Sequence, residues 1–178
     1  MVFQKFLVEQ GTDEINKRVN HRIAVKAVIY KNDKLLLIHT NRGDYKFPGG
    51  GVEEKESHHE ALTREIAEET GYVHCTVKDK LGKVVERKQD EFDEGAIFQM
   101  TSHYYLCELE DEERYPLQLD DYEEEQEFCP IWVSIDEAIE QNDKLKIQLV
   151  KNGWIKRENA VLKELKEVYI NNVKRRPR

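Results

Sequence analysis

The sequence is poor in the residues that build disulfide frameworks and rigid linkers. Its 178 residues include only three cysteines, four prolines and two tryptophans. Cys75, Cys107 and Cys129 are odd in number and widely spaced, and no two of them form a C-x-x-C pair. This spacing indicates neither a disulfide framework nor a zinc site. We therefore expect reduced, structural cysteines.

Long apolar runs are missing as well. The N-terminal segment M-V-F-Q-K-F-L-V-E-Q reaches Glu9 and Asp13 too early to hold a signal-peptide core. No run approaches the ~20 apolar residues that a membrane-spanning helix needs. We therefore predict a cytoplasmic protein that has no membrane partner. No internal repeat and no linker rich in Pro, Gly or Ser divides the chain, whose length suits a single core.

Positive charge is in deficit. The chain has 28 Lys and Arg against 36 Asp and Glu, which gives a net charge of −8. Proteins that follow a nucleic-acid backbone draw their affinity from Lys and Arg that neutralise phosphates, so a nucleic-acid duplex is not an expected partner. A small substrate that carries several phosphates would need a cation to accompany it into so acidic a protein.

Apolar periodicity predicts strands and helices in alternation. Residues 23–29 alternate with the period of a strand, and K-N-D-K at 31–34 is a plausible tight turn into the apolar run 35–38. Ser57 and Glu60 form a capping box that starts a helix, which Gly71 ends. Further strands are predicted at 72–77, 81–87, 96–109 and 130–133, and further helices at 134–140 and from 143 onward. The acid-rich segment 108–127 is predicted to be mainly a solvated loop.

These elements predict an α/β fold in which residues 1–142 form one domain and residues 143–178 form a C-terminal helical extension. Val161, Leu165, Val168 and Tyr169 mark one apolar face of the extension, and residues 174–176 are basic, which suits a helix C-terminus. The extension is predicted to pack on the same domain or on a partner subunit. A homodimer is therefore possible and not required.

One predicted helix carries an unusual acidic group. Glu65, Glu68 and Glu69 fall within roughly 100° of arc, at ~100° of rotation per residue, and Leu62 and Ile66 flank them toward the core. Like charges three and four residues apart on a helix repel each other. A bound cation would offset this repulsion, and hard oxygen donors of this kind suit Mg²⁺ or Mn²⁺.

Neighbouring residues could support such a site. The triple glycine at 49–51 has no side chains, so its carbonyls or amides can approach an ion or a phosphate closely. Arg64 can pair with Glu60 and Glu68 at four residues' distance, and Glu56 lies just before the capping residue. We interpret Arg64 and Glu56 as organisers of the carboxylates rather than as reactants.

The spacing of these residues resembles the signature of the Nudix (MutT-like) hydrolases. Gly50 is followed after five residues by Glu56, and after seven more by the run R-E-I-A-E-E-T-G at 64–71. Every fixed position of the signature is present, and Tyr72 is an aromatic residue where the family usually has an aliphatic one. The signature covers residues 50–72, and the resemblance extends more loosely to the sheet before it and to the region of Trp132.

The resemblance implies an α/β/α sandwich with a mixed β-sheet and hydrolysis of a nucleoside diphosphate linked to another moiety. It implies Mg²⁺ or Mn²⁺ as the cofactor and a small nucleotide as the substrate. The implied metal ligands are Gly49, Glu65, Glu68 and Glu69, and the implied supporting residues are Gly50, Glu56, Arg64 and Gly71. Glu65 is the first candidate for the general base and Glu68 the second. A further acidic ligand from residues 123–127 is left open, and the default interpretation of that segment is a solvated surface.

Two functions are compatible with the resemblance. Nudix-fold regulators that bind a nucleotide without cleaving it typically lose glutamates of the signature, and this chain keeps them all, so hydrolysis is favoured. A nucleoside triphosphate or a modified nucleotide is the first substrate hypothesis. Residues 85–92 contain neither the proline often found in ADP-ribose hydrolases nor the tyrosine often found in dinucleoside polyphosphate hydrolases. The aromatic residues considered for base stacking, or for the core, are Tyr45, Phe47, Phe92, Phe98 and Tyr104.

Overall fold

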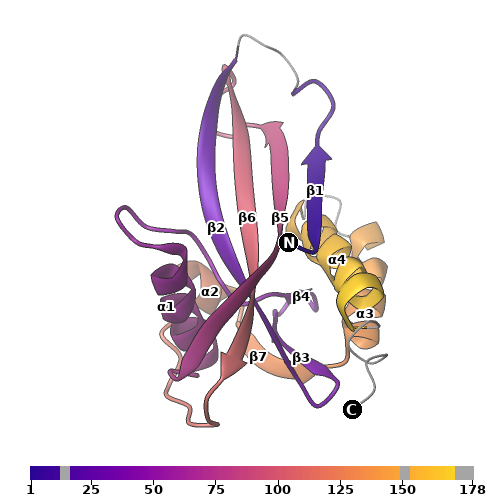
Figure 1. Cartoon of the computed structure of the whole chain (residues 1–178). Coiled ribbons are helices and arrows are strands. Elements are labelled where there is room, and N and C mark those ends of the chain that lie inside the picture. The colour runs from indigo at the N-terminus through magenta and orange to yellow at the C-terminus, as the bar shows by residue number, and fades with distance from the viewer. Residues whose placement is uncertain (13–16, 149–152, 171–178) are drawn as a thin grey trace.

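A mixed seven-stranded sheet runs through the molecule, with α1 on one side and α3 and α4 on the other (Figure 1). The computed structural model describes residues 1–12, 17–148 and 153–170. The strands are β1 (Phe3–Val8), β2 (Arg18–Lys31), β3 (Lys34–His39), β4 (Tyr45–Lys46), β5 (Cys75–Gln89), β6 (Ala96–Leu109) and β7 (Cys129–Val133). The helices are α1 (His58–Thr70), α2 (Asp121–Glu125), α3 (Ile135–Gln148) and α4 (Gly153–Glu164), and the π-helix η1 (Leu165–Ile170) continues α4.

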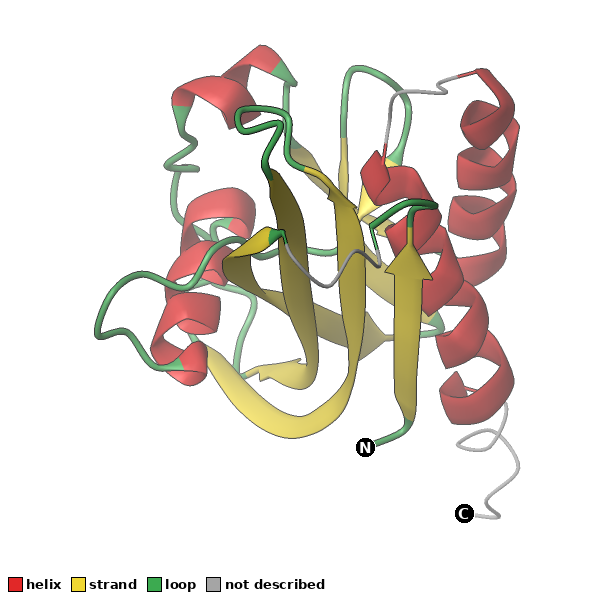
Figure 2. Cartoon of the chain, turned by 90° about the horizontal axis from the view of Figure 1, so that it is seen from above, coloured by secondary structure: helices red, strands yellow, loops and turns green. Residues whose placement is uncertain are grey.

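The sheet combines parallel and antiparallel neighbours. Its order is β1-β5-β6-β2-β3-β4, and β7 pairs with β3 off this path. β1 is parallel to β5 and β2 is parallel to β6, whereas the remaining pairs are antiparallel. Seen from above, helices flank the sheet on both sides (Figure 2). The predicted α/β/α arrangement with a mixed sheet and C-terminal helices is therefore confirmed.

Alternate side chains of β2 build two cores, because successive side chains of a strand point to opposite faces of a sheet. The core on the α1 side contains Val25, Ala27, Ile29, Leu62 and Ile66. The core on the side of α3 and α4 contains Val28, Phe47, Tyr104, Ala138 and Leu162. Lys26 shares its face of β2 with Val28, so its side chain enters the second layer.

Local sequence signals correctly predict the first hairpin and α1. Asn32 and Asp33 have φ of 51° and 60°, the left-handed conformation that a tight two-residue hairpin requires. The capping box is present, since the Ser57 side chain accepts from the Glu60 amide and the Glu60 side chain accepts from the Ser57 amide. Gly71 ends α1 with φ of 79°, and its amide donates to the Ala67 carbonyl.

Several elements differ from the predictions, among them β1, β5 and α2. β1 has no predicted counterpart, because it is an edge strand whose partner, β5, lies far along the chain. The separate strands expected at 72–77 and 81–87 form the single strand β5, whose register against β6 shifts between Val77 and Gly82. α2 lies within the acidic segment, where the capping box of Asp120 and Glu123 starts it.

The C-terminal helices hold β4 in place. α3 spans the position at which the helical extension was expected to begin. Asn142 of α3 accepts a hydrogen bond from the Tyr45 amide and donates one to the Tyr45 carbonyl, both at 2.9 Å. Val161 and Leu165 are buried in the core, as their apolar spacing predicts. The predicted roles of the Val168 and Tyr169 side chains and of residues 174–176 fall outside the described part of the chain.

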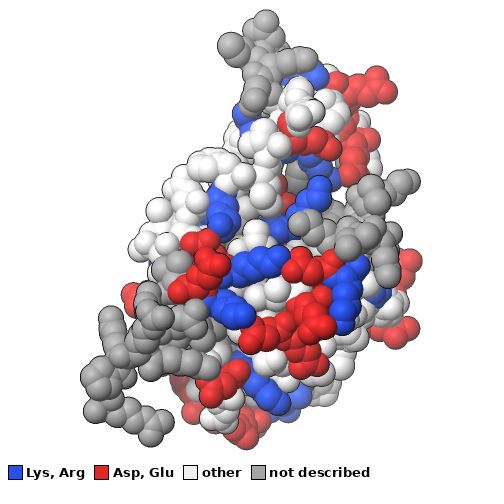
Figure 3. Space-filling model, turned by 90° about the vertical axis from the view of Figure 1, so that its right-hand side faces the viewer, with Lys and Arg blue, Asp and Glu red and all other residues white. Residues whose placement is uncertain are grey.

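Charge on the face that carries α3 and α4 is mixed. Figure 3 shows acidic and basic side chains next to one another on this face. Lys163 pairs with Asp143 at 2.8 Å and Lys166 pairs with Asp136 at 2.5 Å. Such alternation gives this face no field of one sign. Among the described residues, none of the helices has the length and apolarity that a membrane crossing needs.

Candidate active site

The glycine loop is bonded to β2 through its backbone. The Val25 amide donates to the Gly50 carbonyl and the Ala27 amide to the Pro48 carbonyl, both at 2.9 Å, and the Val52 amide donates to the Ile23 carbonyl at 3.1 Å. The loop thus extends the sheet beside β2. Because α1 packs on the same part of β2, the loop meets the acidic side of α1.

Two of the three glycines are required by close approach. Gly49 has φ of 129°, and a Cβ there would overlap the carbonyl oxygen of Val25. A Cβ on Gly50 would lie 2.6 Å from Cδ of Glu65, inside its carboxylate. A Cβ on Gly51 would meet only the Arg22 guanidinium, at 3.3 Å. The loop therefore fits against the fixed backbone of β2 on one side and against the Glu65 carboxylate on the other.

Replacing Gly50 with Ala is expected to lower kcat roughly 10²-fold, which is the order of loss that a 1 Å misplacement causes in an active site. The added methyl group would push the Glu65 carboxylate aside, and this carboxylate is the end of a flexible side chain, so the fold should persist. Steady-state kinetics and circular dichroism would test this. Gly51→Ala is the matched control, with a much smaller expected loss. Equal losses in the two variants would contradict the role given to Gly50.

Arg64 gathers the carboxylates at the base of the loop. Its Nε and Nη2 donate to the two carboxylate oxygens of Glu56, at 2.8 and 3.0 Å. Its Nη1 lies 2.9 Å from Oε1 of Glu65 and 3.1 Å from Oε2 of Glu68, and Nη2 also donates to the Gly51 carbonyl at 3.2 Å. The predicted pairing with Glu68 is present, whereas Glu60 bonds the Ser57 amide at 2.8 Å. Arg64 thus ties the loop to the helix.

Three carboxylates converge in front of the loop. Oxygen atoms of Glu65, Glu69 and Glu123 all lie within 4.8 Å of one another. Glu123 comes from α2, so the acidic segment supplies a ligand candidate at one position of the range that the sequence left open. Glu68 lines the same cavity and is held by Arg64 rather than grouped with these three. The Gly49 amide donates to Oε2 of Glu69 at 2.8 Å and fixes its direction.

Burial disfavours the charged form of the Glu65 and Glu69 carboxylates in the absence of a cation. Glu65 is 7% exposed and Glu69 is 2% exposed. Burial raises the pKa of Glu69 to about 8, although the charges of Lys26 and Lys46 act to lower it. Burial also raises the pKa of Glu65, against the hydrogen bond from Arg64. Two buried carboxylates beside the half-buried carboxylate of Glu123 are a donor set that fits Mg²⁺ or Mn²⁺.

Lys26, which is not among the residues predicted for the site, donates a hydrogen bond to the Gly49 carbonyl. Lys26 is 7% exposed, and its ammonium group donates to the carbonyl of Gly49 and, at 3.4 Å, to that of Phe47. The resemblance implied that the Gly49 carbonyl binds metal. One signal in the sequence could have identified Lys26, because it is a single charge inside the otherwise apolar strand segment 23–29.

A second lysine stands among aromatic rings. Nζ of Lys46 lies 3.7 Å from the ring centroid of Phe128, 5.7 Å from that of Tyr122 and 6.0 Å from that of Trp154. Burial, together with the charge of Lys26, lowers the pKa of Lys46 to about 8. Tyr122 lies in α2 and Phe128 shortly after it, whereas Trp154 comes from α4, which the sequence did not connect with the site.

Most of these groups face a cavity of about 1560 Å³. It is lined by the converging carboxylates, by the glycine loop, by the basic residues Arg22, Lys88 and Lys156 and by the aromatic residues Phe98, Tyr122 and Trp154. Of the aromatic residues considered from sequence, Phe98 lines this cavity, Phe92 is 98% exposed, and Tyr45, Phe47 and Tyr104 are buried core residues. The cavity therefore combines acidic, basic and aromatic surfaces.

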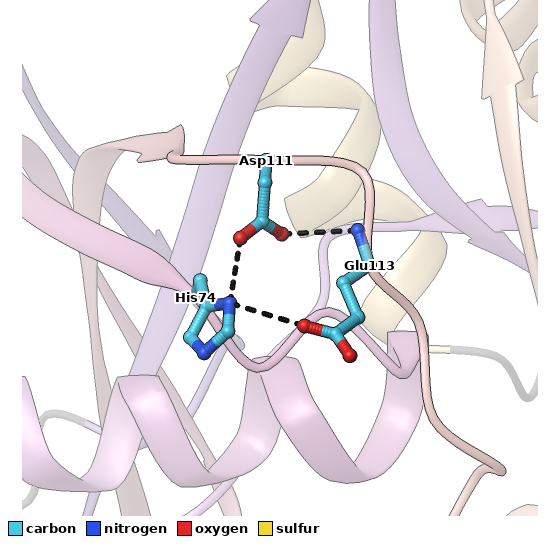
Figure 4. Close-up of side chains that lie close together, drawn as sticks. All are labelled: His74, Asp111 and Glu113. Carbon is cyan, nitrogen blue, oxygen red and sulfur yellow. Dashed lines mark hydrogen bonds and ion pairs between the residues drawn. The ribbon is translucent and has the colours of Figure 1, made fainter.

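A second group of possible metal ligands lies outside the cavity. Figure 4 shows His74, Asp111 and Glu113 turned toward one another from two segments that follow α1 and β6. Nδ1 of His74 is 2.6 Å from Oδ2 of Asp111 and 3.7 Å from Oε2 of Glu113, and all three residues are exposed. The Glu110 amide donates to the His74 carbonyl at 2.9 Å. We interpret this group as a clasp between the two segments.

The clasp gives a testable pH dependence. The hydrogen bond that His74 donates to Asp111 and the charge of Asp111 raise the pKa of His74, so an NMR titration is expected to place this pKa above the usual value of about 6.5. The clasp's contribution to stability is then full below about pH 6.5 and is lost as the pH rises through the folded-state pKa of His74. Asp111→Asn should return the pKa toward its usual value. Glu112→Gln is the matched control, because Glu112 pairs with Lys31 instead, and an unchanged pKa in Asp111→Asn would contradict this account.

Comparisons with known proteins identify a family and a related fold. A family model described as NUDIX domain matches residues 20–153. A probable DHNTP pyrophosphohydrolase of Lactococcus lactis subsp. cremoris is 32% identical over 115 residues, which cover 60% of this chain and 67% of that protein. An ADP-ribose pyrophosphatase of Methanocaldococcus jannaschii is 44% identical over 83 residues, which cover 44% of this chain and 48% of that protein. A solved NUDIX hydrolase from Nitrosomonas europaea aligns over 86% of this chain and 95% of its own, with a TM-score of 0.52 and 21% identity, a likeness of fold alone.

Proposed function

Because this chain belongs to the Nudix hydrolase family, we propose that it is a Mg²⁺-dependent hydrolase that cleaves a pyrophosphate bond in a nucleoside diphosphate linked to another moiety. One observation carries the proposal: buried carboxylates of Glu65 and Glu69 meet the carboxylate of Glu123 directly beside the glycine loop. Burying carboxylates together is costly unless a cation joins them. Glu65, Glu69 and Glu123 would hold that cation.

The ion would supply charge neutralisation at the phosphate oxygens and a more acidic water, the two contributions expected of metals in phosphoryl chemistry. The residues of the chain orient the carboxylates and exclude water from them. The Gly49 amide holds Oε2 of Glu69, and Arg64 holds Oε1 of Glu65 at 2.9 Å. Both glutamates are shielded from solvent, which strengthens the electrostatic interactions of the site.

Glu65 is the proposed general base, with Glu68 as the second candidate. A base works best when its pKa approaches the working pH, and burial raises the pKa of Glu65. Glu68 is more open, with 35% of its side chain exposed, and Oε2 is held by Arg64. Each could take the proton of an attacking water at a carboxylate oxygen. The products would be two phosphate-bearing fragments, one of them a nucleotide.

The cavity supports a substrate with two parts. Its volume of about 1560 Å³ exceeds the ~300–1,000 Å³ typical of small-ligand pockets, so groups on both sides of a diphosphate have room. Arg22, Lys88 and Lys156 offer hydrogen bonds to phosphate oxygens. A nucleoside triphosphate or a modified nucleotide is the first proposed substrate. The relatives named for DHNTP and for ADP-ribose differ in substrate, so ADP-ribose belongs in the same test.

The alternative is a regulator that binds a nucleotide and does not cleave it. Purified protein should be incubated with Mg²⁺ or Mn²⁺ and with nucleoside triphosphates, an oxidised triphosphate, ADP-ribose and a dinucleoside polyphosphate, and the products separated by chromatography. Hydrolysis of a triphosphate at the proposed bond should give a nucleoside monophosphate and pyrophosphate. Tight binding of a nucleotide without any product in either metal would favour the regulator.

A further inference from the structure

We propose that the ammonium group of Lys26 is a built-in cation of the active site. It binds the Gly49 carbonyl, and the chain therefore binds one divalent ion fewer than it would if that carbonyl were free. This inference rests on the proposed metal site. It concerns which cation positions of the site are filled by a side chain of the protein and which are filled by metal ions. Lys26 is then a positioning residue, which sets how many ions the carboxylates can hold.

The position of Lys26 follows from the register of β2. Its neighbours Val25 and Ala27 face α1, and both donate their amides to the glycine loop, so their backbone is fixed. The Lys26 side chain extends from the opposite face of β2, and its ammonium group donates to the Gly49 carbonyl. The fixed backbone of β2 therefore positions the Lys26 charge at the Gly49 carbonyl.

The chemistry of the position favours a cation. The ammonium group of a lysine that is 7% exposed needs hydrogen-bond acceptors and anions in the place of water. The Gly49 and Phe47 carbonyls supply the acceptors. The same glycine donates its amide to Glu69 at 2.8 Å, so one peptide links the ammonium to a buried carboxylate. A carbonyl oxygen has two lone pairs, so a divalent ion there would either share the oxygen with the ammonium at close range or displace the ammonium into a poorly hydrated space. In both cases the ion would face the charge of Lys26.

Lys46 provides an internal comparison. It lines the same cavity and also lies near the site, yet its ammonium stands over the Phe128 ring at 3.7 Å. Removing either lysine takes one positive charge from the cavity. Replacing Lys26 should also free the Gly49 carbonyl, and replacing Lys46 should not. The two variants therefore separate an effect of charge from an effect of an occupied ligand position.

The test is a count of bound Mn²⁺ per chain by electron paramagnetic resonance, for the wild-type protein, Lys26→Met and Lys46→Met. Lys26→Met is expected to bind one more Mn²⁺ per chain than the wild type, and Lys46→Met the same number as the wild type. Circular dichroism checks the fold, and Lys26→Ala serves as a second variant. In the wild type, the ¹⁵Nζ resonance of Lys26 should keep the shift of a hydrogen-bonded ammonium at saturating Mg²⁺.

Each contrary result has a distinct meaning. Equal counts in the wild type and Lys26→Met, a gain of one ion in both lysine variants, or a Lys26 resonance that moves to a solvent-exposed shift on Mg²⁺ binding would each overturn the inference and leave the proposed function standing. No Mn²⁺ bound by any of the proteins would overturn the proposed metal site, and the inference with it.

Discussion

Glu65→Gln is expected to lower kcat roughly 10²–10⁴-fold, the range that a general base contributes to catalysis. The substitution removes a charge from the group that Glu65 forms with Glu69 and Glu123, so affinity for Mn²⁺ should fall as well. The amide oxygen of Gln can still accept from Arg64, whose Nη1 lies 2.9 Å from Oε1 of Glu65. The fold should therefore persist. Kinetics at saturating Mg²⁺ and a titration with Mn²⁺ measure the two effects.

The stability of this variant is the informative control. Removing one of several crowded carboxylates relieves repulsion, so the melting temperature of Glu65→Gln in EDTA is expected to equal or exceed that of the wild type. Glu54→Gln is the matched variant, because Glu54 is exposed and precedes α1 on the same segment, and its activity should be that of the wild type. Full activity of Glu65→Gln, or equal losses in both variants, would remove Glu65 from the reaction.

The parts of the site that could be predicted from sequence are those whose signals are local. The capping box of Ser57, the terminating Gly71 and the periodicity between them define α1 without any tertiary information. Because the helix then fixes the direction of each side chain, the proximity of Glu65, Glu68 and Glu69 to one another follows from spacing alone. The pairing of Arg64 with Glu56 across the loop depends on the same helix start.

The parts that could not be predicted depend on distant segments. Glu123 meets Glu65 only in the folded chain, where the Gln118 amide, just before α2, donates to the Glu68 carbonyl of α1. The composition around Glu123 predicts a solvated acidic loop. Lys26 was missed for another reason: the alternation of residues 23–29 predicts a strand but does not indicate that both faces of β2 are buried. A charge on a strand with two buried faces must find partners inside the protein, and here these are loop carbonyls.

The largest loss of stability is expected when Glu158, a buried carboxylate of α4, is replaced. Glu158 is fully buried, at 0% exposed, and Oε1 binds Arg157 at 2.8 Å. Its other oxygen, Oε2, accepts from the Phe47 amide at 3.0 Å, just before the glycine loop. Glu158→Ala would leave that amide without its acceptor and leave Arg157, 6% exposed, with the carboxylate of Glu86 alone. Breaking a buried pair in this way costs about 3–5 kcal/mol.

Urea unfolding of three variants measures this loss. Glu158→Ala is expected to lose the full amount, and Glu158→Gln should lose less, because its amide oxygen can still accept from Phe47. Glu164→Ala, on the same helix, is the control, since Glu164 pairs with Lys5 where its side chain is 23% exposed, and such pairs are worth about 0–1 kcal/mol. Because the Phe47 amide that Glu158 holds lies just before the glycine loop, Glu158→Ala should loosen that loop and weaken Mn²⁺ binding in the protein that remains folded. Equal stabilities of Glu158→Ala and Glu164→Ala would mean that α4 covers the sheet without supporting the loop.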